Sequence, residues 1–498
     1  MDIQKQDFRT ESAYQPMPSE SIVEGRLSLP VEKNDIHRVL MMHGKVHANA
    51  SSSDGKVYMD GEVTFNVVYL CTDGTIDFFE ASSPFRHSED MMMEGTSMHI
   101  YVKGSVKEVD YKVEDARSVY VKGIVSMKMY GMMSKTHSAV SGLDGMQVKM
   151  YDKMLDYTKE YRHDTKTIAE DIRVPQTLPR VEKILMVDAY PVVKSVKTQE
   201  LKIIVEGDIK MMEMYLSEDK NAPMQHFYES IPFGEIISCE NAMDTDRVMA
   251  DADLYDMTMT IADEDVLRLT AKMDMNCMIM GTQQMELVKD AYSLIEPVDV
   301  KTMMMEQKPM KLWGNAKAIA RANIVVPEER PAVNRVVCIK ASPVILSMSP
   351  GTDRVYLEGV MMYTICYFSP DGMHSYSSDV PFEAEAQMDG MHEDYDVYVN
   401  ADVEYCTFEG AGRDISVKFM MDVEMKAYMP DSFSMVTDIE EMDEPMMRKT
   451  GIIIYFADGE ETIWDIAKRY KITPQMVEKY NPDIEETTTK GQKILIMG

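Results

Sequence analysis

The sequence lacks the residue patterns on which most catalytic and metal sites depend. Its six cysteines form no Cys-x-x-Cys pair, which argues against the usual zinc-binding and thioredoxin-like signatures. It contains no Gly-x4-Gly-Lys-Ser/Thr phosphate loop, no Gly-x-Ser-x-Gly nucleophile turn and no His-Glu-x-x-His helix. The sequence therefore favours a non-enzymatic protein that binds no cofactor and no metal.

An excess of positive charge and a long apolar run are also missing. The chain has 52 Lys and Arg residues against 84 Asp and Glu residues, so its formal net charge is −32. Such an acidic chain repels phosphate backbones and anionic lipid head groups, which argues against nucleic acid as a partner. No apolar run approaches the roughly 18 residues of a membrane span, and residues 1–7 do not resemble an export signal. We therefore expect a cytoplasmic, reduced chain without membrane insertion.

Leucine is scarce, and methionine takes its place. The chain has 19 Leu and 50 Met residues. Thioether sulfur suits Cu(I), but the triplets Met91–Met93 and Met303–Met305 have no Cys or His at ligand spacing. Most Met residues alternate with polar residues in strand-like runs, where an adaptable side chain fills irregular cores. We interpret Met as core filling, and we interpret His37, His43 and His47 as ordinary surface or core residues.

One unit recurs three times at a period close to 150 residues. Each copy has a proline followed eight residues later by a basic and a β-branched residue, then a glycine at the start of an alternating run, and then a Pro-Phe pair. Such alternation predicts half-buried strands. The markers are Pro30, Arg38-Val39, Gly61 and Pro84-Phe85 in the first copy, Pro175, Lys183-Ile184, Gly207 and Pro232-Phe233 in the second, and Pro327, Arg335-Val336, Gly359 and Pro381-Phe382 in the third.

The copies also differ at two places. The fourth position after the leading proline is Pro179 in the second copy and Pro331 in the third, but Asn34 in the first. The second copy places Glu213 on the apolar face of its glycine-bearing strand. A carboxylate on that face predicts a local difference, such as an edge strand or a β-bulge.

The chain is therefore predicted to be mainly β. Three tandem antiparallel β-sandwich-like repeat domains are expected over residues 1–150, 151–299 and 300–437. The acidic stretch at 438–449 is expected to be a linker, and 450–498 a small separate βααβ domain.

The last domain has clear helix signals. Thr462 begins one helix, with Asp465 as its capping-box partner, and Thr473 followed by Pro474 begins a second. The run 459–470 and the two later elements 481–484 and 490–496 resemble a LysM domain over its whole length. Relative to that family, Glu461 is an extra residue in the Gly-Asp-Thr turn.

This resemblance implies a binding groove for glycans that contain N-acetylglucosamine. The groove would lie between the first strand-helix loop and the second helix-strand loop. Carried onto this chain, its residues are Gly459, Thr462, Ile463, Asn481, Pro482, Asp483 and Ile484.

The three repeats resemble SPOCS domains through the proline-basic element, the glycine-bearing strand, the Pro-Phe pair and the run 288–293. Three such domains followed by a LysM domain are similar to the SipL-like family of clostridial spore coat morphogenetic proteins. The resemblance implies a scaffold of coat assembly in the mother-cell cytoplasm, at the forespore surface. It implies that the LysM domain docks on a SpoIVA-like coat-basement ATPase, with other coat proteins as further candidates. The alternative left open is a LysM anchor that binds peptidoglycan, with the repeats as spacers.

Overall fold

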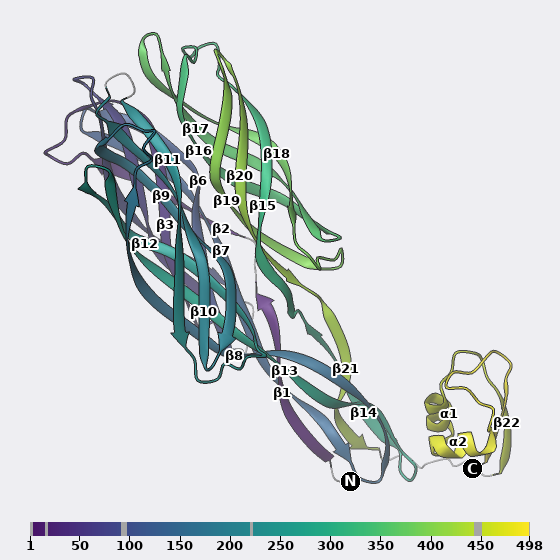
Figure 1. Ribbon diagram of the computed structural model, residues 1–498. Helices are drawn as coiled ribbons and strands as arrows, with labels where there is room; N and C mark the ends of the chain where they lie inside the picture. Colours follow the sequence, from purple (N-terminus) through teal and green to yellow (C-terminus); the bar gives the residue numbers. More distant parts are fainter. Residues whose placement is uncertain (1–2, 15–17, 91–96, 220–222, 443–450, 498) are drawn as a thin grey trace.

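The chain folds into an elongated, mainly β body. The computed structural model describes residues 3–14, 18–90, 97–219, 223–442 and 451–497. Strands hold about 78% of the residues and helices about 3%, which confirms the predicted fold class. In Figure 1 three sandwiches form a broad head, a narrower stalk extends from the head, and a small module with two helices lies beside the end of the stalk.

Six strands build each repeat. Those of the first repeat are β2 (Ser19–Ser28), β3 (Ile36–Ser53), β4 (Lys56–Cys71), β5 (Ile76–Asp90), β6 (Ser97–Asp115) and β7 (Ser118–Leu143). Those of the second are β8 (Met146–Arg173), β9 (Val181–Gln199), β10 (Lys202–Ser217), β11 (Met224–Ser238), β12 (Arg247–Asp263) and β13 (Val266–Ser293). Those of the third are β15 (Met310–Val325), β16 (Arg335–Gly351), β17 (Arg354–Ser369), β18 (Gly372–Gln387), β19 (Asp396–Ala411) and β20 (Asp414–Tyr428).

Each repeat is a sandwich of two antiparallel sheets. In the third repeat β16, β17 and β18 form one sheet, and β15, β20 and β19 form the other. The other two repeats place their corresponding strands in the same order. Three separate apolar cores fill the spaces between the paired sheets, one in each repeat. Inward-facing apolar residues alternate with outward-facing polar ones along these strands, as the period of two predicts.

The stalk consists of three two-stranded antiparallel ladders. β7, β8 and β13 continue past their sandwiches, where β1 (Ile3–Tyr14) pairs with β7, and β8 pairs with β13. The third ladder joins β14 (Val298–Gln307) to β21 (Asp431–Glu441). The three ladders form the sides of the stalk and enclose an apolar core, with a second apolar cluster toward the tip. The core consists of Phe8, Ala139, Leu155, Met285, Leu287, Met305, Phe433 and Met435. The segments between the repeats therefore contribute strands to the stalk.

The glycine and the Pro-Phe pair that mark each copy lie opposite each other. Gly207 on β10 pairs in register with Phe233 on β11, and the other two repeats repeat this pairing. A Cβ atom at Gly207 would lie 2.3 Å from the carbonyl oxygen of Val192 and 2.6 Å from the ring of Phe233. Only glycine fits because the neighbouring strand and the aromatic ring cover this position.

A tyrosine in each repeat explains why Asn34 can replace proline. The hydroxyl groups of Tyr69, Tyr215 and Tyr367 donate hydrogen bonds to the carbonyl oxygens of Asn34, Pro179 and Pro331 at 3.1, 2.9 and 3.1 Å. The acceptor is a backbone carbonyl, which every residue type supplies. The turn after the leading proline is thereby tied to the glycine-bearing strand in the same way three times.

Glu213 lies where the alternating pattern placed it, but β10 is not an edge strand. β10 is the middle strand of the sheet β11-β10-β9, and a register shift follows at Met214/Tyr215. Glu213 has no exposed surface, and neither carboxylate oxygen has a hydrogen-bond partner. Burial raises the pKa of Glu213 well above its usual value, which favours the neutral acid in the fold. The predicted edge position is therefore wrong, and the bulge lies beside this residue.

The C-terminal module has the predicted βααβ order. Its elements are β22 (Ile452–Phe456), α1 (Ile463–Tyr470), α2 (Pro474–Tyr480) and β23 (Lys493–Met497). The capping box between Thr462 and Asp465 is formed, and Thr473 caps α2 with Pro474 in its first turn. Neither of these two helices, the only ones in the described residues, is long and apolar enough to cross a bilayer.

Two predicted segments lie partly outside the described residues. Of the expected acidic linker, residues 438–441 belong to β21, whereas 443–449 are not described. The triplet Met91–Met93 is not described either. In the other triplet Met303 and Met304 are exposed on β14, and Met305 is buried in the stalk.

Candidate functional site

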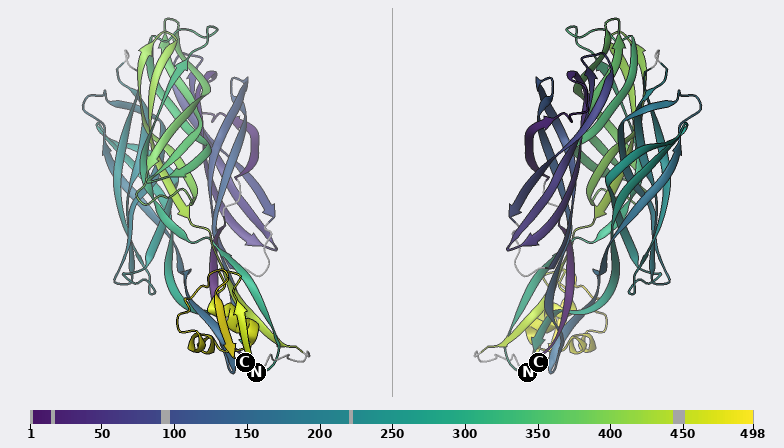
Figure 2. Two further views of the ribbon diagram at one scale, coloured as in Figure 1. Left: turned by 90° about the vertical axis from the view of Figure 1, so that its right-hand side faces the viewer. Right: turned by 90° about the vertical axis from the view of Figure 1, so that its left-hand side faces the viewer.

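The three repeats surround a common axis, because residues at the same position in each copy meet. His43, Asp188 and Lys340 each lie thirteen residues after the leading proline of their repeat. His43 Nε2 lies 3.4 Å from Asp188 Oδ1, and Asp188 also forms an ion pair with Lys340. Burial alone would raise the pKa of Asp188, but Lys340 and His43 hold it well below its usual range. Figure 2 shows the repeats side by side around the long axis of the molecule.

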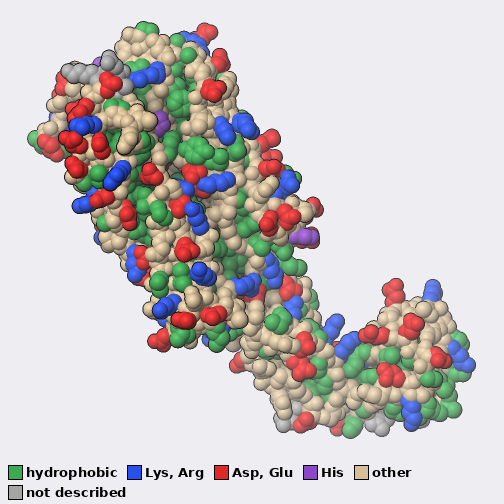
Figure 3. All heavy atoms as spheres, viewed as in Figure 1, with side chains coloured by type: hydrophobic (Ala, Val, Ile, Leu, Met, Phe, Trp, Pro, Cys, Tyr) green, Lys and Arg blue, Asp and Glu red, His purple; other side chains and the backbone are tan. Residues whose placement is uncertain are grey.

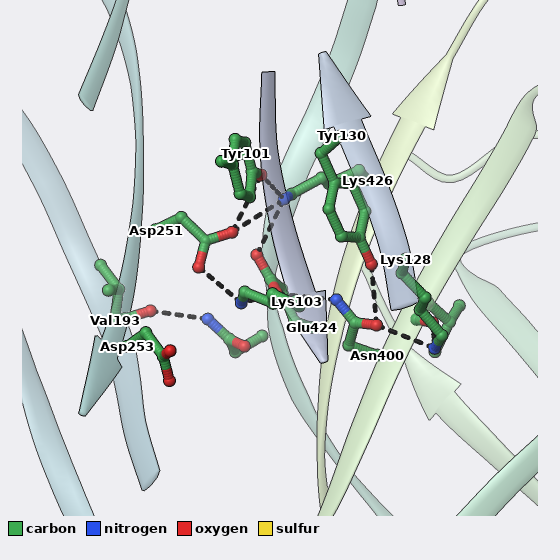
Figure 4. A network of polar contacts seen from close by, with 12 residues as sticks. Tyr101, Lys103, Lys128, Tyr130, Val193, Asp251, Asp253, Asn400, Glu424 and Lys426 are labelled. Atoms are coloured by element: carbon green, nitrogen blue, oxygen red, sulfur yellow. Dashed lines mark hydrogen bonds and ion pairs between the residues drawn. The ribbon is translucent and has the colours of Figure 1, made fainter. Parts of the chain in front are cut away.

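A second charged layer lies further along this axis (Figure 4). Lys103 Nζ lies 2.5 Å from Asp251 Oδ1 and 3.2 Å from Glu424 Oε2. Lys426 Nζ lies 3.2 Å from Asp251 Oδ2 and 3.3 Å from Glu424 Oε1, and it donates to the Tyr101 hydroxyl at 2.7 Å. The first repeat supplies Lys103, the second Asp251, and the third Glu424 and Lys426. Two positive and two negative charges thus balance at a point where all three repeats meet.

Burial opposes the charges of Glu424 and Lys426, and their partners reverse its effect. Burial would raise the pKa of Glu424, but Lys103 and Lys426 bring it well below its usual range. Burial would lower the pKa of Lys426, but Glu424 and Asp251 raise it. Removing one member would leave the remaining buried charges unbalanced, which costs several kcal/mol. The network therefore fixes which faces of the repeats meet.

Methionine is concentrated in the apolar layers between the repeats. Near the outer end of the head, twelve buried residues from all three repeats form one cluster: Leu40, Met41, Val68, Leu185, Met186, Met212, Met214, Met224, Val337, Cys338, Cys366 and Met373. A second cluster, toward the stalk, consists of Met132, Met249, Met278, Met280, Met310 and Tyr428. The unbranched Met side chain adapts to irregular surfaces, which suits the junction of three repeats with different sequences. Met is thus a filler of inter-repeat junctions as well as of sandwich cores.

The basic residue of the proline-basic element connects neighbouring repeats in the first two copies. Lys183 of the second repeat forms an ion pair with Asp77 of the first, at 2.5 Å. Arg38 of the first repeat donates to the backbone carbonyl of Met373 in the third and contacts His374 Nδ1 at 3.2 Å. The second and third repeats meet through further pairs, among them the ion pair of Asp188 and Lys340 described above. The repeats therefore form a closed ring of three.

His43 and His47 contact neighbouring side chains of the second repeat. His47 stacks on the Tyr255 ring at 4.6 Å between centroids, and His43 contacts Asp188. Within the described parts of the chain, no three His, Cys, Asp or Glu side chains gather as a metal ion would require. All six cysteines are buried and free.

The structure brings the two loops of the predicted glycan groove together. Thr462, at the end of the first loop, forms an isolated antiparallel bridge with Thr487 of the second, and the Ile463 amide donates to the Glu486 carbonyl at 3.3 Å. Gly459 has a φ of +96° and lies against Lys490, where a Cβ would approach to 3.2 Å. Glu461, the extra residue of the turn, bonds the Tyr455 hydroxyl at 2.6 Å and Arg469 at 2.6 Å.

The side chains of the remaining groove residues differ in their exposure and in their hydrogen bonds. Pro482 and Asp483 are exposed, whereas Ile484 is partly buried against the core of the module. The side-chain nitrogen of Asn481 donates to the backbone carbonyl oxygens of Val477 and Leu495, each at 2.8 Å. Its side-chain oxygen accepts from the backbone N–H of Leu495 at 2.7 Å. Asn481 is therefore a structural clamp between α2 and β23.

The module is clasped to the end of β13 through α1. Asp290 accepts hydrogen bonds from Trp464 Nε1 at 2.8 Å and from Lys468 Nζ at 2.6 Å. Tyr292 has no exposed surface, donates to the Ile472 carbonyl at 2.6 Å, and meets the Trp464 ring edge-on at 4.9 Å. Trp464 is thus partly buried at an internal interface. We call the contacts of Asp290 and Tyr292 with α1 and Ile472 the clasp.

Neither the axis nor the clasp was predicted, although both left traces in the sequence. The position thirteen residues after the leading proline carries His43, Asp188 and Lys340 in the three copies. These side chains can pair with one another only if the copies pack together. Asp290 and Tyr292 lie in a run that marked the resemblance to the repeats, yet their side chains face the module. Nothing in the sequence shows that these distant positions are neighbours, because the contacts are set by tertiary packing.

Three segments of the chain match the protein family model described as "SipL, SPOCS domain". The matched residues are 35–114, 180–262 and 332–410. Each segment begins near the glycine-bearing sheet of one repeat and ends in β6, β12 or β19. The chain therefore carries three SPOCS domains, as the sequence resemblance implied. No curated protein and no solved structure matches the chain.

Proposed function

We propose that this protein is a non-enzymatic scaffold of spore coat assembly, and that its C-terminal LysM-like module docks on a SpoIVA-like coat-basement ATPase at the forespore surface. The observation that carries the proposal is the match of all three repeats to SPOCS domains, whose family description names SipL. The proposed place of action is the mother-cell cytoplasm. Other coat proteins are proposed as partners of the repeats.

The arrangement of the repeats supports a mechanical role. Charged layers and Met-rich layers hold the three sandwiches as a closed ring, and the stalk extends from that ring to the module (Figure 1). The clasp gives the module a fixed attachment through Asp290 and Tyr292. A rigid body with a docking module at one end is suited to holding a partner at a set distance from whatever binds the head.

Capture of the partner tests the docking assignment. Purified SpoIVA-like ATPase from the same genome would be immobilised, and binding of the full chain would be compared with that of residues 1–450. We expect the shortened chain to lose capture while keeping the far-ultraviolet circular dichroism of a β protein. Unchanged capture by a folded shortened chain would refute docking through the module.

Localisation tests the place of action. A fluorescent fusion of the full chain in sporulating cells is expected to form a ring around the forespore. Diffuse fluorescence throughout the mother cell in the presence of the ATPase would count against a coat scaffold.

The alternative function is a LysM anchor that binds peptidoglycan. The adjacency of the two loops at Thr462 and Thr487 favours it, because LysM glycan grooves lie between these loops. The engaged side chain of Asn481 and the exposed carboxylates of Asp483, Glu485 and Glu486 weaken it. Sedimentation of the full chain with purified peptidoglycan decides between the two functions: strong pelleting that deletion of the module abolishes would support the anchor.

A further inference from the structure

β22 of the module is apolar on both faces. Ile453 and Tyr455 pack against the core of the module, as one face of a half-buried strand should. Ile452, Ile454 and Phe456 point the other way and are 68%, 51% and 61% exposed. In a sheet with one solvated face, these outward positions are normally polar. A strand that is apolar on both sides is typical of one that is covered on both sides.

The same surface continues across β23. Ile452, Ile454 and Phe456 pair in register with Met497, Leu495 and Lys493. Leu495 and Met497 are half-buried, and neither belongs to the core of the module, which takes Ile494 and Ile496 from this strand. We call the six residues 452, 454, 456, 493, 495 and 497 the outer face. It holds five apolar side chains and one lysine.

The outer face is separate from the clasp and from the loops. The clasp uses Trp464, Lys468 and Ile472, none of which belongs to β22 or β23. In Figure 1 β22 lies on the side of the module that is turned away from the stalk, and Figure 3 shows hydrophobic side chains on that side. The clasp covers α1, and the outer face leaves Ile452, Ile454 and Phe456 exposed.

Building on the proposed function, we infer that the outer face is the surface with which the module grips its protein partner, and that the partner covers it with an apolar helix bearing a carboxylate beside Lys493. A glycan is a poor occupant because the face offers no side-chain hydrogen-bond donor or acceptor other than Lys493. β22 spans about 13 Å at ~3.3 Å per residue, which matches about nine residues of α-helix at ~1.5 Å each. One amphipathic helix therefore covers Ile452, Ile454 and Phe456 together.

Charge determines which kind of protein fits. The chain carries a net charge of −32, yet the outer face contains no carboxylate and one lysine. A partner helix with an acidic residue next to its apolar stripe would pair with Lys493, opposite Phe456. Pairing of two copies of this chain is opposed, because two strongly acidic bodies repel each other.

The test uses the full chain and the SpoIVA-like ATPase as the probe. The double variant Ile454→Glu/Phe456→Glu is expected to weaken binding at least 100-fold, because it buries two carboxylates against apolar partner residues. Lys493→Glu is expected to weaken binding about tenfold. The control Met476→Glu alters a residue of α2 that is 36% exposed and lies outside the outer face, and it should change the dissociation constant less than twofold.

The outcomes separate this inference from the proposed function. All three variants alter exposed residues, so unchanged melting temperatures would show that the module is folded. If removal of the module abolishes capture but the double variant binds normally, the outer face is the wrong surface and the docking function stands. If removal of the module leaves capture intact, the docking function itself is wrong. Dimerisation that the double variant abolishes would make the occupant a second copy and overturn the inference.

Discussion

Asp188 binds Lys340 across the boundary between the second and third repeats, and the two residues occupy the same position within their repeats. In an assembly of three identical domains this position would place three like charges around one axis. A single chain avoids that repulsion because each copy carries a different side chain there, with His43 as the third. The fusion of three repeats thus permits a charged axis that three identical chains could not build. Because these contacts join all three repeats, the head is expected to unfold as one unit.

The buried network makes Lys426 the most sensitive of these charges. Its side chain is 3% exposed and neutralises Asp251 and Glu424. Lys426→Met should lower the free energy of unfolding by about 3–5 kcal/mol, because it leaves two buried carboxylates facing only Lys103. Urea unfolding followed by tryptophan fluorescence would measure the loss.

A matched control lies in the same repeat. Arg354 and Glu385 form an exposed ion pair at 3.2 Å, so Arg354→Met should cost less than about 1 kcal/mol. Equal losses for the two Met variants would show that the axis adds no more stability than a surface ion pair does.

The sequence predicted the parts of this protein that depend on local patterns. The alternation of apolar and polar residues predicted the strands of the sandwiches, and the capping box of Thr462 and Asp465 predicted the start of α1. The edge-strand prediction at Glu213 failed because a polar residue on an apolar face usually indicates exposure, whereas here the sandwich encloses it. The ring, the stalk and the clasp could not be predicted, since they join residues more than a hundred positions apart, such as Tyr292 and Ile472.

Gly207 should tolerate no side chain. A Cβ there would lie 2.3 Å from the Val192 carbonyl oxygen and 2.6 Å from the Phe233 ring. Gly207→Ala is expected to destabilise the protein by about 1–3 kcal/mol, because backbone and ring must both move. Gly234, in the neighbouring strand, has open space around it, so Gly234→Ala should change the free energy of unfolding by no more than about 0.5 kcal/mol. Thermal unfolding of both variants checks the difference, and similar melting temperatures would contradict the covering role of Phe233.

Glu213 should make stability depend on pH. Burial raises its pKa in the fold above the ordinary value of 4.5, so the folded protein keeps a proton that the unfolded chain loses. The stability contributed by this residue is full below pH 4.5 and falls as the pH rises toward its folded pKa, by about 1.4 kcal/mol per pH unit. Glu213→Gln removes the titration, so the variant should gain stability relative to the parent between pH 5 and 7. Urea unfolding of both proteins at pH 5, 6 and 7 measures this, and a constant difference would mean that Glu213 is ionised in the fold.

The clasp should hold the module through a single carboxylate. Asp290 accepts from both Trp464 and Lys468, so Asp290→Ala removes two charge-assisted hydrogen bonds and leaves the indole N–H without its acceptor. A loss of about 1.5–3 kcal/mol in local stability is expected, which corresponds to amide hydrogen exchange about 10- to 100-fold faster in α1 and at the end of β13. Hydrogen exchange of the head should stay unchanged. Asp299→Ala, which removes an exposed carboxylate from β14 of the stalk, serves as the control and should leave exchange in α1 as in the parent. Protection of α1 that survives Asp290→Ala would show that Tyr292, buried under Ile472 and Trp464, holds the module without help from the carboxylate.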